Sequence, residues 1–269
     1  MERDCGSLTS SHAPRIVLIG TGNVAWHLSA ALDRVADVVA VYGRTASRAN
    51  DIASRTRNAR AVTELTDVPR DADFYVIAVT DSAIPAIAAS LPEVNGIVAH
   101  TSGTTGAEAL SACRARGTGS FYPLQTFSAG RAVSLSEVPF FIEGSDAATA
   151  ASLHGLAEKV SGSVYALDSE RRRRMHLAAV VASNFANALW GAAGDILALA
   201  DLPLEVLQPL LTETIRKAFA TSPRQAQTGP ARRNDTATIG RHLDMIDDPL
   251  LKEIYTDMTQ LIIKQQSKE

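Results

Sequence analysis

Four short apolar runs rich in β-branched residues, separated by stretches of helical spacing, constrain the fold of this chain more than any other feature. The runs are Ile16–Ile19, Asp37–Tyr42, Phe74–Val79 and Gly96–Ala99. Strands that read as continuous apolar runs are typical of parallel sheets covered by helices on both faces. The first part of the chain therefore predicts an α/β domain with a mostly parallel sheet.

The strand pattern ends near Leu167, and the remainder predicts helices. Shorter strands are expected at Ser120–Leu124, Pro139–Ile142 and Ser163–Leu167, with a helix over Ala147–Val160 between the last two. Asp168, Ser169 and Glu170 then supply an N-cap and an acidic first turn. The later helices are expected at 168 to about 199, 204–222, 235–245 and 249–264. We predict a loose polar tail over 1–12, a first domain over 13–167 and an all-α domain over 168–269.

Composition and charge exclude several classes of protein. Hydrophobic residues make up 46% and charged residues 20% of the 269 residues, which is typical of soluble globular proteins. The net charge of -3 argues against nucleic acid as a partner. The two cysteines, Cys5 and Cys113, form no disulfide framework or metal-binding pattern, and no apolar run approaches a membrane span. We expect a cytoplasmic protein with no metal site and no membrane partner.

A glycine-rich turn follows the first predicted strand. The sequence from Gly20 to Ala25 fits G-x-G-x-x-G/A and opens a predicted helix. Such glycines allow a tight turn and a close approach to a pyrophosphate, which then lies at the helix N-terminus. An ordinary strand-to-helix turn is the alternative. The cofactor-binding residues predicted from this motif are Gly20, Thr21, Gly22, Asn23 and Val24.

The end of the second predicted strand indicates which dinucleotide is bound. NAD sites usually place a carboxylate there to hold the ribose hydroxyls. This chain instead has Arg44 and Thr45, with Arg48 one helical turn further. A guanidinium can pair with a 2′-phosphate that a carboxylate would repel. The sequence favours NADP over NAD and over S-adenosylmethionine, unless the two arginines are only solvated surface cations.

The next two strands end in further polar residues. Thr80 and Asp81 follow one strand, and His100 and Ser102 follow the other. Ligands of open α/β sheets bind at the carboxyl ends of the strands, so all four are predicted to lie near the nicotinamide half of the cofactor. The alternatives are helix capping by Asp81 or Ser82 and a purely turn-forming role for His100 and Ser102.

A polar stripe interrupts the first apolar helix of the second half. His176, Ser183, Asn184 and Asn187 fall within about a quarter of a uniform helix. Buried without partners, such groups cost roughly 1–3 kcal/mol each, so we expect them to face a wet cleft between the domains or an internal hydrogen-bond network. His176 is the leading candidate for proton transfer, with His100 and His242 in reserve, while the two amides would orient a substrate. The arginines at 171–174 could attract an anionic substrate, but four arginines at a helix start are more often partly solvated.

A third polar segment extends from Gln225 to His242. Gly229 and Pro230 mark a turn, and Asp235 or Thr236 can cap a helix on which Thr238 and His242 share a face. The segment is interpreted either as a recognition loop or as a well-capped connection between helices.

Five motifs together resemble a bacterial family of proteins assigned as NADP oxidoreductases. They are Gly20–Ala25, His100–Gly103, Tyr122–Phe127, His176–Ala179 with Asn184 and Asn187, and Gln227–Asp235. The resemblance covers nearly all of the chain from Arg15 onwards. It implies a Rossmann-like domain followed by a helical domain of unknown function.

The wider similarity is to the 6-phosphogluconate dehydrogenase-like group, which includes pyrroline-5-carboxylate reductases, 3-hydroxyacid dehydrogenases, ketopantoate reductases and deazaflavin-dependent NADP oxidoreductases. It implies a helical dimerisation domain, hence a homodimer, and a substrate cleft between domains. One residue differs from the hydroxyacid dehydrogenases: Val180 occupies the place of their lysine, four residues before Asn184. Their acid–base mechanism therefore does not transfer directly.

The leading hypothesis from the sequence is an NADP-dependent oxidoreductase that transfers a hydride between nicotinamide and a small carbonyl or imine substrate. One alternative is a non-catalytic NADP-binding sensor or scaffold. Another is hydride exchange between NADP and a deazaflavin.

Overall fold

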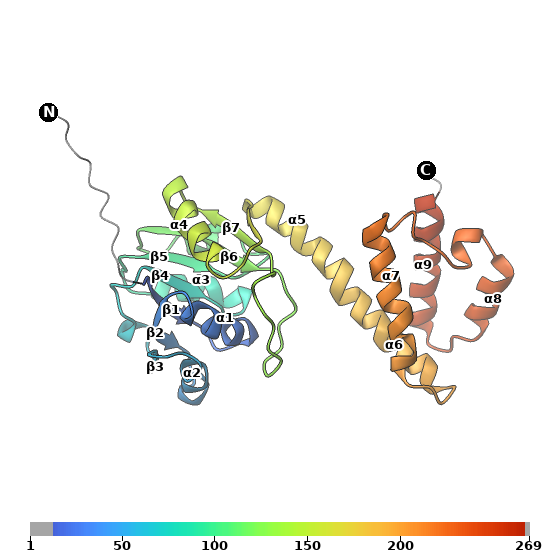
Figure 1. The fold of residues 1–269 in the computed structure, drawn as a ribbon, viewed down its shortest axis with the longest axis horizontal. Helices are drawn as coiled ribbons and strands as arrows, with labels where there is room; N and C mark the ends of the chain where they lie inside the picture. Colours follow the sequence, from blue (N-terminus) through green and yellow to red (C-terminus); the bar gives the residue numbers. More distant parts are fainter. Residues whose placement is uncertain (1–12, 267–269) are drawn as a thin grey trace. The chain divides into compact units, whose positions relative to one another are not determined.

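The computed structural model describes residues 13–266, and by internal contacts the chain divides into two compact units, Met1–Ala179 and Val180–Glu269. Figure 1 shows that the first unit is built around one sheet, whereas the described part of the second contains helices and turns. The predicted fold class, an α/β domain followed by a helical region, is confirmed. The predicted tail over 1–12 lies outside the described residues.

Eight strands form one sheet in the order β3-β2-β1-β4-β5-β6-β7-β8. Their bounds are β1 Arg15–Ile19, β2 Asp37–Tyr42, β3 Arg60–Val62, β4 Phe74–Ile77, β5 Ile97–His100, β6 Gly117–Pro123, β7 Phe140–Gly144 and β8 Val164–Ala166. Neighbouring strands from β3 to β6 are parallel, and β7 is antiparallel to β6. The carboxyl ends of the first six strands therefore meet at one edge of the sheet.

Alternating side chains of each strand pack on opposite faces of the sheet, as the two-residue period of a strand requires. Ile16 and Leu18 of β1 belong to one buried cluster, whereas Val17 and Ile19 belong to the other. All four side chains have no solvent exposure. This double burial explains why the strands read as continuous apolar runs rather than as alternating ones.

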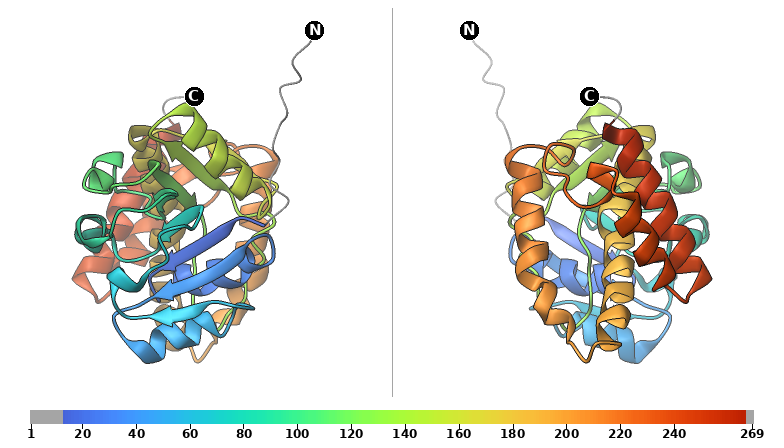
Figure 2. Two further views of the ribbon diagram at one scale, coloured as in Figure 1. Left: turned by 90° about the vertical axis from the view of Figure 1, so that its left-hand side faces the viewer. Right: turned by 90° about the vertical axis from the view of Figure 1, so that its right-hand side faces the viewer.

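The helices of the first unit cover these two faces. They are α1 (Asn23–Asp33), α2 (Ala46–Ala53), α3 (Ile84–Ser90) and α4 (Ala147–Glu158). Leu28 of α1 and Leu153 of α4 pack in the cluster on one face, and Ile84 of α3 packs on the other. Figure 2 shows α4 across the end of the sheet, where it contacts β6, β7 and β8.

One long helix starts in the first unit and continues into the second. It consists of α5 (Ser169–Ala179), a π-helical turn (Val180–Phe185) and α6 (Ala186–Ala198). Asp168 caps its start, because Asp168 Oδ1 accepts from the N–H of Arg171 at 2.8 Å, as predicted. A π turn holds more residues than an α turn, so the uniform spacing that defined the polar stripe does not persist through residues 180–185. Nothing in the sequence indicated this turn.

By length and composition alone, the helix from Ser169 to Ala198 could cross a membrane, with a mean hydropathy of 1.2 in its most apolar window. The sequence analysis did not anticipate such a segment. The indication is weak, since the core helix of a soluble protein passes the same test.

The second unit also contains α7 (Gln208–Ala220), α8 (Thr236–Asp244) and α9 (Pro249–Gln266). Ala231 is the only buried residue in its described part. Several large apolar side chains are instead widely exposed, among them Leu199 (82%), Phe219 (90%), Met245 (74%) and Leu250 (64%). By its own contacts, this helical unit therefore leaves much apolar surface uncovered.

One detail differs from the sequence predictions. Strand β3 was not expected, because its three residues include Arg60 and give too short an apolar run. By internal contacts the two units divide after Ala179. The first turns of α5 belong to the sheet-containing unit because Arg172 is wholly buried against it.

Candidate functional site

The glycine-rich turn joins β1 to α1 at the carboxyl edge of the sheet. Gly20 has a φ of 127°, and a side chain there would collide with the carbonyl oxygen of Ala78. Gly22 caps α1, and nothing lies within 4 Å of the position that its Cβ would occupy. The first turn of α1 has no acidic residue. This arrangement leaves open space beside free helix N–H groups, which suits a pyrophosphate.

The other motif residues have contacts within the protein. The side chain of Asn23 donates to the carbonyl of Phe127 at 3.0 Å and accepts from the N–H of Ala129 at 3.3 Å. Asn23 thus holds the loop after β6 against α1, a role that the sequence did not suggest. Thr21 packs near Gly43, and the half-buried Val24 packs against the core.

Arg44, Thr45 and Arg48 follow β2 and are exposed. Within residues 13–266 neither arginine has an ion-pair partner. Thr45 caps α2 through its backbone, and its side chain makes no capping hydrogen bond. All three side chains are therefore available to a phosphate group at this edge of the sheet.

Thr80 and Asp81 follow β4 and are also exposed. Asp81 accepts a hydrogen bond from the Thr104 hydroxyl at 2.5 Å, which ties the β4 end to the turn after β5. The alternative of helix capping is not observed: the helical turn at Asp81–Ala83 and helix α3 both begin without a side-chain cap.

His100 and Ser102 lie deeper than the sequence suggested. Both are buried, and the N–H of Ser102 donates to His100 Nδ1 at 3.2 Å. Burial, reinforced by the charge of Arg172, lowers the pKa of His100 to about 4. The imidazole is therefore neutral at pH 7 and is poorly suited to deliver a proton. Ser102 Oγ accepts from the N–H groups of Thr104 and Thr105, which shapes the turn.

A tyrosine–histidine pair lies at the carboxyl end of β6. The hydroxyl of Tyr122 is 3.1 Å from Nδ1 of His176, which projects from α5. A Cβ on Gly103 would approach His176 Nδ1 to 2.5 Å, so the imidazole packs directly on this backbone. Burial, followed by the charge of Asp81, raises the pKa of Tyr122, so the phenol keeps its proton at neutral pH.

Sequence reasoning placed His176 among the candidates but missed Tyr122 as a site residue. A signal was present, because Tyr122 lies in a predicted strand, two residues beyond Ser120, which pairs with His100 at the end of the parallel neighbour. Side chains at such strand ends share one edge of the sheet.

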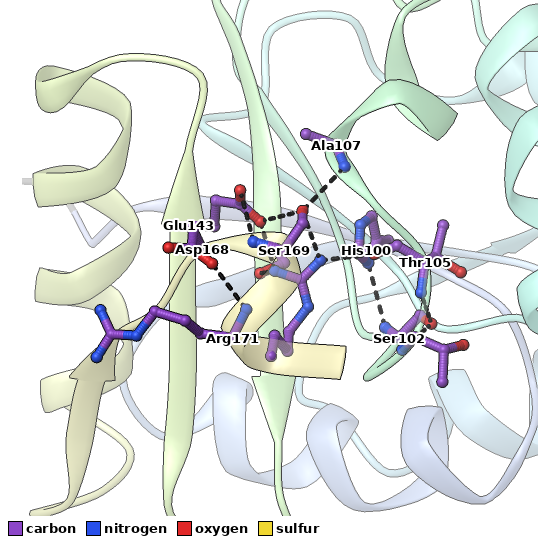
Figure 3. Close-up of polar contacts among 11 residues, drawn as sticks. His100, Ser102, Thr105, Ala107, Glu143, Asp168, Ser169 and Arg171 are labelled. Atoms are coloured by element: carbon purple, nitrogen blue, oxygen red, sulfur yellow. Dashed lines mark hydrogen bonds and ion pairs between the residues drawn. The ribbon is translucent and has the colours of Figure 1, made fainter. Parts of the chain in front are cut away.

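A buried charged network lies beside this pair. The register aligns His100, Ser120 and Glu143 as neighbours across β5, β6 and β7. The guanidinium of Arg172 donates to Ser120 Oγ at 2.8 Å and to Glu143 Oε2 at 2.5 Å. Figure 3 shows Glu143, Ser169, His100 and Thr105 gathered at this point. Burial opposes ionisation of Glu143, but hydrogen bonds from Ser169 and Arg172 keep its pKa below the ordinary value.

The remaining predicted residues belong to the second unit. Asn184 lies in the π turn, Asn187 lies in α6, and both are exposed. Of the two predicted caps, Asp235 and Thr236, it is Asp235 that caps α8, because its carboxylate accepts from the N–H of Thr238 at 3.0 Å. His242 Nδ1 lies 2.8 Å from the hydroxyl of Tyr255.

Comparisons with known proteins agree with the two-part architecture. The model of a Rossmann-like domain matches residues 5–124, and the model described as a domain of unknown function, DUF2520, matches residues 138–262. No curated protein matches this chain. A solved structure of the putative NADP oxidoreductase BF3122 from Bacteroides fragilis is 38% identical, with a TM-score of 0.85 over 94% of this chain and 98% of that one.

More distant solved structures share the fold. Protein TM1727 from Thermotoga maritima is 21% identical, with a TM-score of 0.72 over 94% of this chain and 98% of that one. Pyrroline-5-carboxylate reductase from Streptococcus pyogenes is 14% identical, with a TM-score of 0.61 over 96% of this chain and all of that one. The strong match to the Bacteroides protein and the two domain matches show that this chain belongs to the family that joins a Rossmann-like domain to a DUF2520 domain.

Proposed function

We propose that the chain is an NADP-dependent oxidoreductase that reduces a small carbonyl or imine substrate, or oxidises the corresponding product. The observation that carries this proposal is the Tyr122–His176 pair. It lies at the same carboxyl edge of the sheet as the glycine-rich turn and the cations after β2. A titratable side chain, His176, thus lies at the same edge of the sheet as the proposed dinucleotide-binding turn.

The residues present fit NADP. The open space at Gly22 and the N-terminus of α1 would hold the pyrophosphate, and Arg44, Thr45 and Arg48 would hold the 2′-phosphate. Thr80 and Asp81 would lie towards the nicotinamide half. When bound, the nicotinamide donates or accepts the hydride. The 38% identical relative is itself named as an NADP oxidoreductase.

His176 is the proposed proton donor for reduction. An imidazole can exchange a proton near neutral pH, whereas the buried His100 is held neutral. Tyr122 holds His176 through Nδ1, which leaves the other ring nitrogen, Nε2, for the substrate. Asn184 and Asn187 are proposed to orient the acceptor atom through their amides, which can donate or accept but do not titrate.

We also propose that the active form is a homodimer assembled through the helical unit. Leu199, Phe219 and Leu250 are mostly exposed in the single chain. Apolar surface of this extent on a soluble protein usually marks an interface. A second copy of the same helical unit would cover it.

The direct experiment follows NADPH oxidation with a panel of keto acids and cyclic imines. Relatives that share the fold include an imine reductase from Pseudomonas sp. and a reductive aminase from Aspergillus terreus crystallised with NADPH, so imines belong in the panel. Turnover of at least one substrate supports the proposal. Tight NADPH binding without oxidation by any substrate would favour a sensor or scaffold, and oxidation by a deazaflavin alone would favour cofactor exchange.

A further inference from the structure

We propose that Arg172 is a positioning residue for His176, acting by fastening both α5 and the turn after β5 to the sheet. This inference rests on the proposed role of His176. It goes beyond that role by assigning a function to the ion pair between the buried Arg172 and the half-buried Glu143, which neither the dinucleotide site nor the proton donor uses directly.

The contacts of Arg172 are unusual for a residue in a run of four arginines. Its side chain has no solvent exposure and is the largest fully buried one in the described chain. It contacts three structural elements: β6 through Ser120, β7 through Glu143, and the turn after β5 through the carbonyl of Thr105 at 2.6 Å. Arg171, Arg173 and Arg174 are exposed.

Stability alone does not explain this arrangement. Removing a guanidinium and a carboxylate from water is costly, and an apolar pair of similar volume often stabilises a fold equally well. Within residues 13–266 the Nε atom of Arg172 also lacks a hydrogen-bond partner. A planar guanidinium fork can, however, hold several groups in a fixed geometry.

That geometry bears directly on His176. His176 follows Arg172 by four residues on α5, so the two side chains lie on the same face, about 6 Å apart along the helix axis. The turn that Arg172 holds through Thr105 also contains Gly103, the residue on which His176 packs. One side chain thus fixes the helix that carries the imidazole and the backbone that supports it.

Glu143 completes the attachment. Its two oxygens accept from the N–H and the hydroxyl of Ser169 at 3.0 and 2.6 Å, at the start of α5. The ion pair and these hydrogen bonds join the first turn of the helix to β7. Loosening them would let His176 move relative to Tyr122 without altering the glycine-rich turn.

The test compares Arg172→Lys with Arg173→Lys, an exposed neighbour in the same run, in the full-length protein. A lysine keeps the charge but cannot hold Glu143, Ser120 and Thr105 together. We measure the ¹⁵N shifts of the His176 ring across pH, NADPH affinity, and kcat and KM for the best substrate. His176→Gln assigns the ring signals.

For Arg172→Lys we expect unchanged NADPH affinity, a kcat lower by roughly 10- to 100-fold with little change in KM, and altered ¹⁵N shifts of the His176 ring. Arg173→Lys should match the wild type in every measurement. An unchanged His176 spectrum in folded Arg172→Lys, or an equal change in Arg173→Lys, would overturn the inference.

Two further variants cover the case in which Arg172→Lys does not fold. Glu143→Gln removes one acceptor for Ser169, and Ser120→Ala removes one contact of the guanidinium. Each should shift the His176 spectrum, and normal spectra in both would refute the positioning role. If the wild type turns over no substrate while these spectra change, the positioning role stands and the proposed function fails.

Discussion

The hydroxyl of Tyr122 lies 3.1 Å from Nδ1 of His176, although 54 residues separate the two in the sequence. Because the raised pKa of Tyr122 keeps the phenol protonated, its hydroxyl can donate to a neutral Nδ1 or accept from the Nδ1–H of an imidazolium. The proposed proton donor is the imidazolium, which would give up its Nε2 proton while its Nδ1–H donates to Tyr122. The pair therefore holds the imidazole in one orientation through both protonation states.

Replacing Tyr122 with phenylalanine should impair the chemical step without affecting cofactor binding. The variant keeps the ring but loses the hydrogen bond to His176, so we expect kcat to fall roughly 10-fold or more with unchanged NADPH affinity. Steady-state kinetics and fluorescence titration test this. Tyr165→Phe on β8 is the matched control, since its hydroxyl contacts only Ser163 in the described structure. Equal kcat values for Tyr122→Phe and the wild type would contradict the assignment.

NADPH should bind more tightly than NADH by roughly 10- to 100-fold, the equivalent of one or two charge-assisted hydrogen bonds. Arg44→Ala should remove most of this preference, since Arg44 has no ion-pair partner within residues 13–266. Titration of both nucleotides measures the ratio. Arg34→Ala, at the opposite end of α1, should leave it unchanged. Equal affinities for the two nucleotides would rule out the proposed 2′-phosphate site.

Local sequence signals predicted much of the fold and the position of the glycine-rich turn. Continuous apolar runs marked β1, β2, β4 and β5 because both faces of the sheet are buried. The caps at Asp168 and Asp235 could be predicted because a capping side chain bonds to a backbone N–H only three residues further along the chain. The glycine-rich turn could be predicted because the strand before it and the helix after it are also close in the sequence.

The part of the candidate site around Tyr122 and His176 was less visible in the sequence, because pairing between distant segments creates it. Register alone brings Ser120 beside Glu143, and the sequence does not reveal which of four consecutive arginines turns inward. The contact between Tyr122 and His176 depends on how Arg172 attaches helix α5 to the sheet. The sequence suggested that His100 could reach the cofactor, because the turn that follows it is polar. In the structure β5 lies in the centre of the sheet, and the His100 side chain is buried there.

The buried His100 should make the folded state less stable in mild acid. In the folded protein it stays neutral down to about pH 4, whereas in the unfolded chain it binds a proton below about 6.5. Between these values the unfolded state binds more protons, so stability falls as the pH falls, by about 2–3 kcal/mol from this group. Urea unfolding at several pH values should show a smaller loss for His100→Gln than for the wild type. If the free energies of unfolding of the two proteins fell in parallel with pH, His100 would not contribute to the loss of stability.

The protein should have about twice the 28.5 kDa chain mass at micromolar concentration. Phe219→Glu should weaken the dimer, because Phe219 is 90% exposed in the single chain and burying such a ring contributes roughly 1.5–3 kcal/mol. Light scattering measures the mass, and circular dichroism checks that the helices remain. A wild-type monomer with intact helices would exclude this assembly.

The most direct test of the proposed chemistry is the turnover number of His176→Gln with the best carbonyl or imine substrate, measured beside its NADPH affinity. If His176 donates the proton, kcat should fall by roughly 100- to 10,000-fold while the dissociation constant for NADPH stays within about twofold of the wild type. Full activity in His176→Gln would contradict the account and leave the imidazole a structural partner of Tyr122.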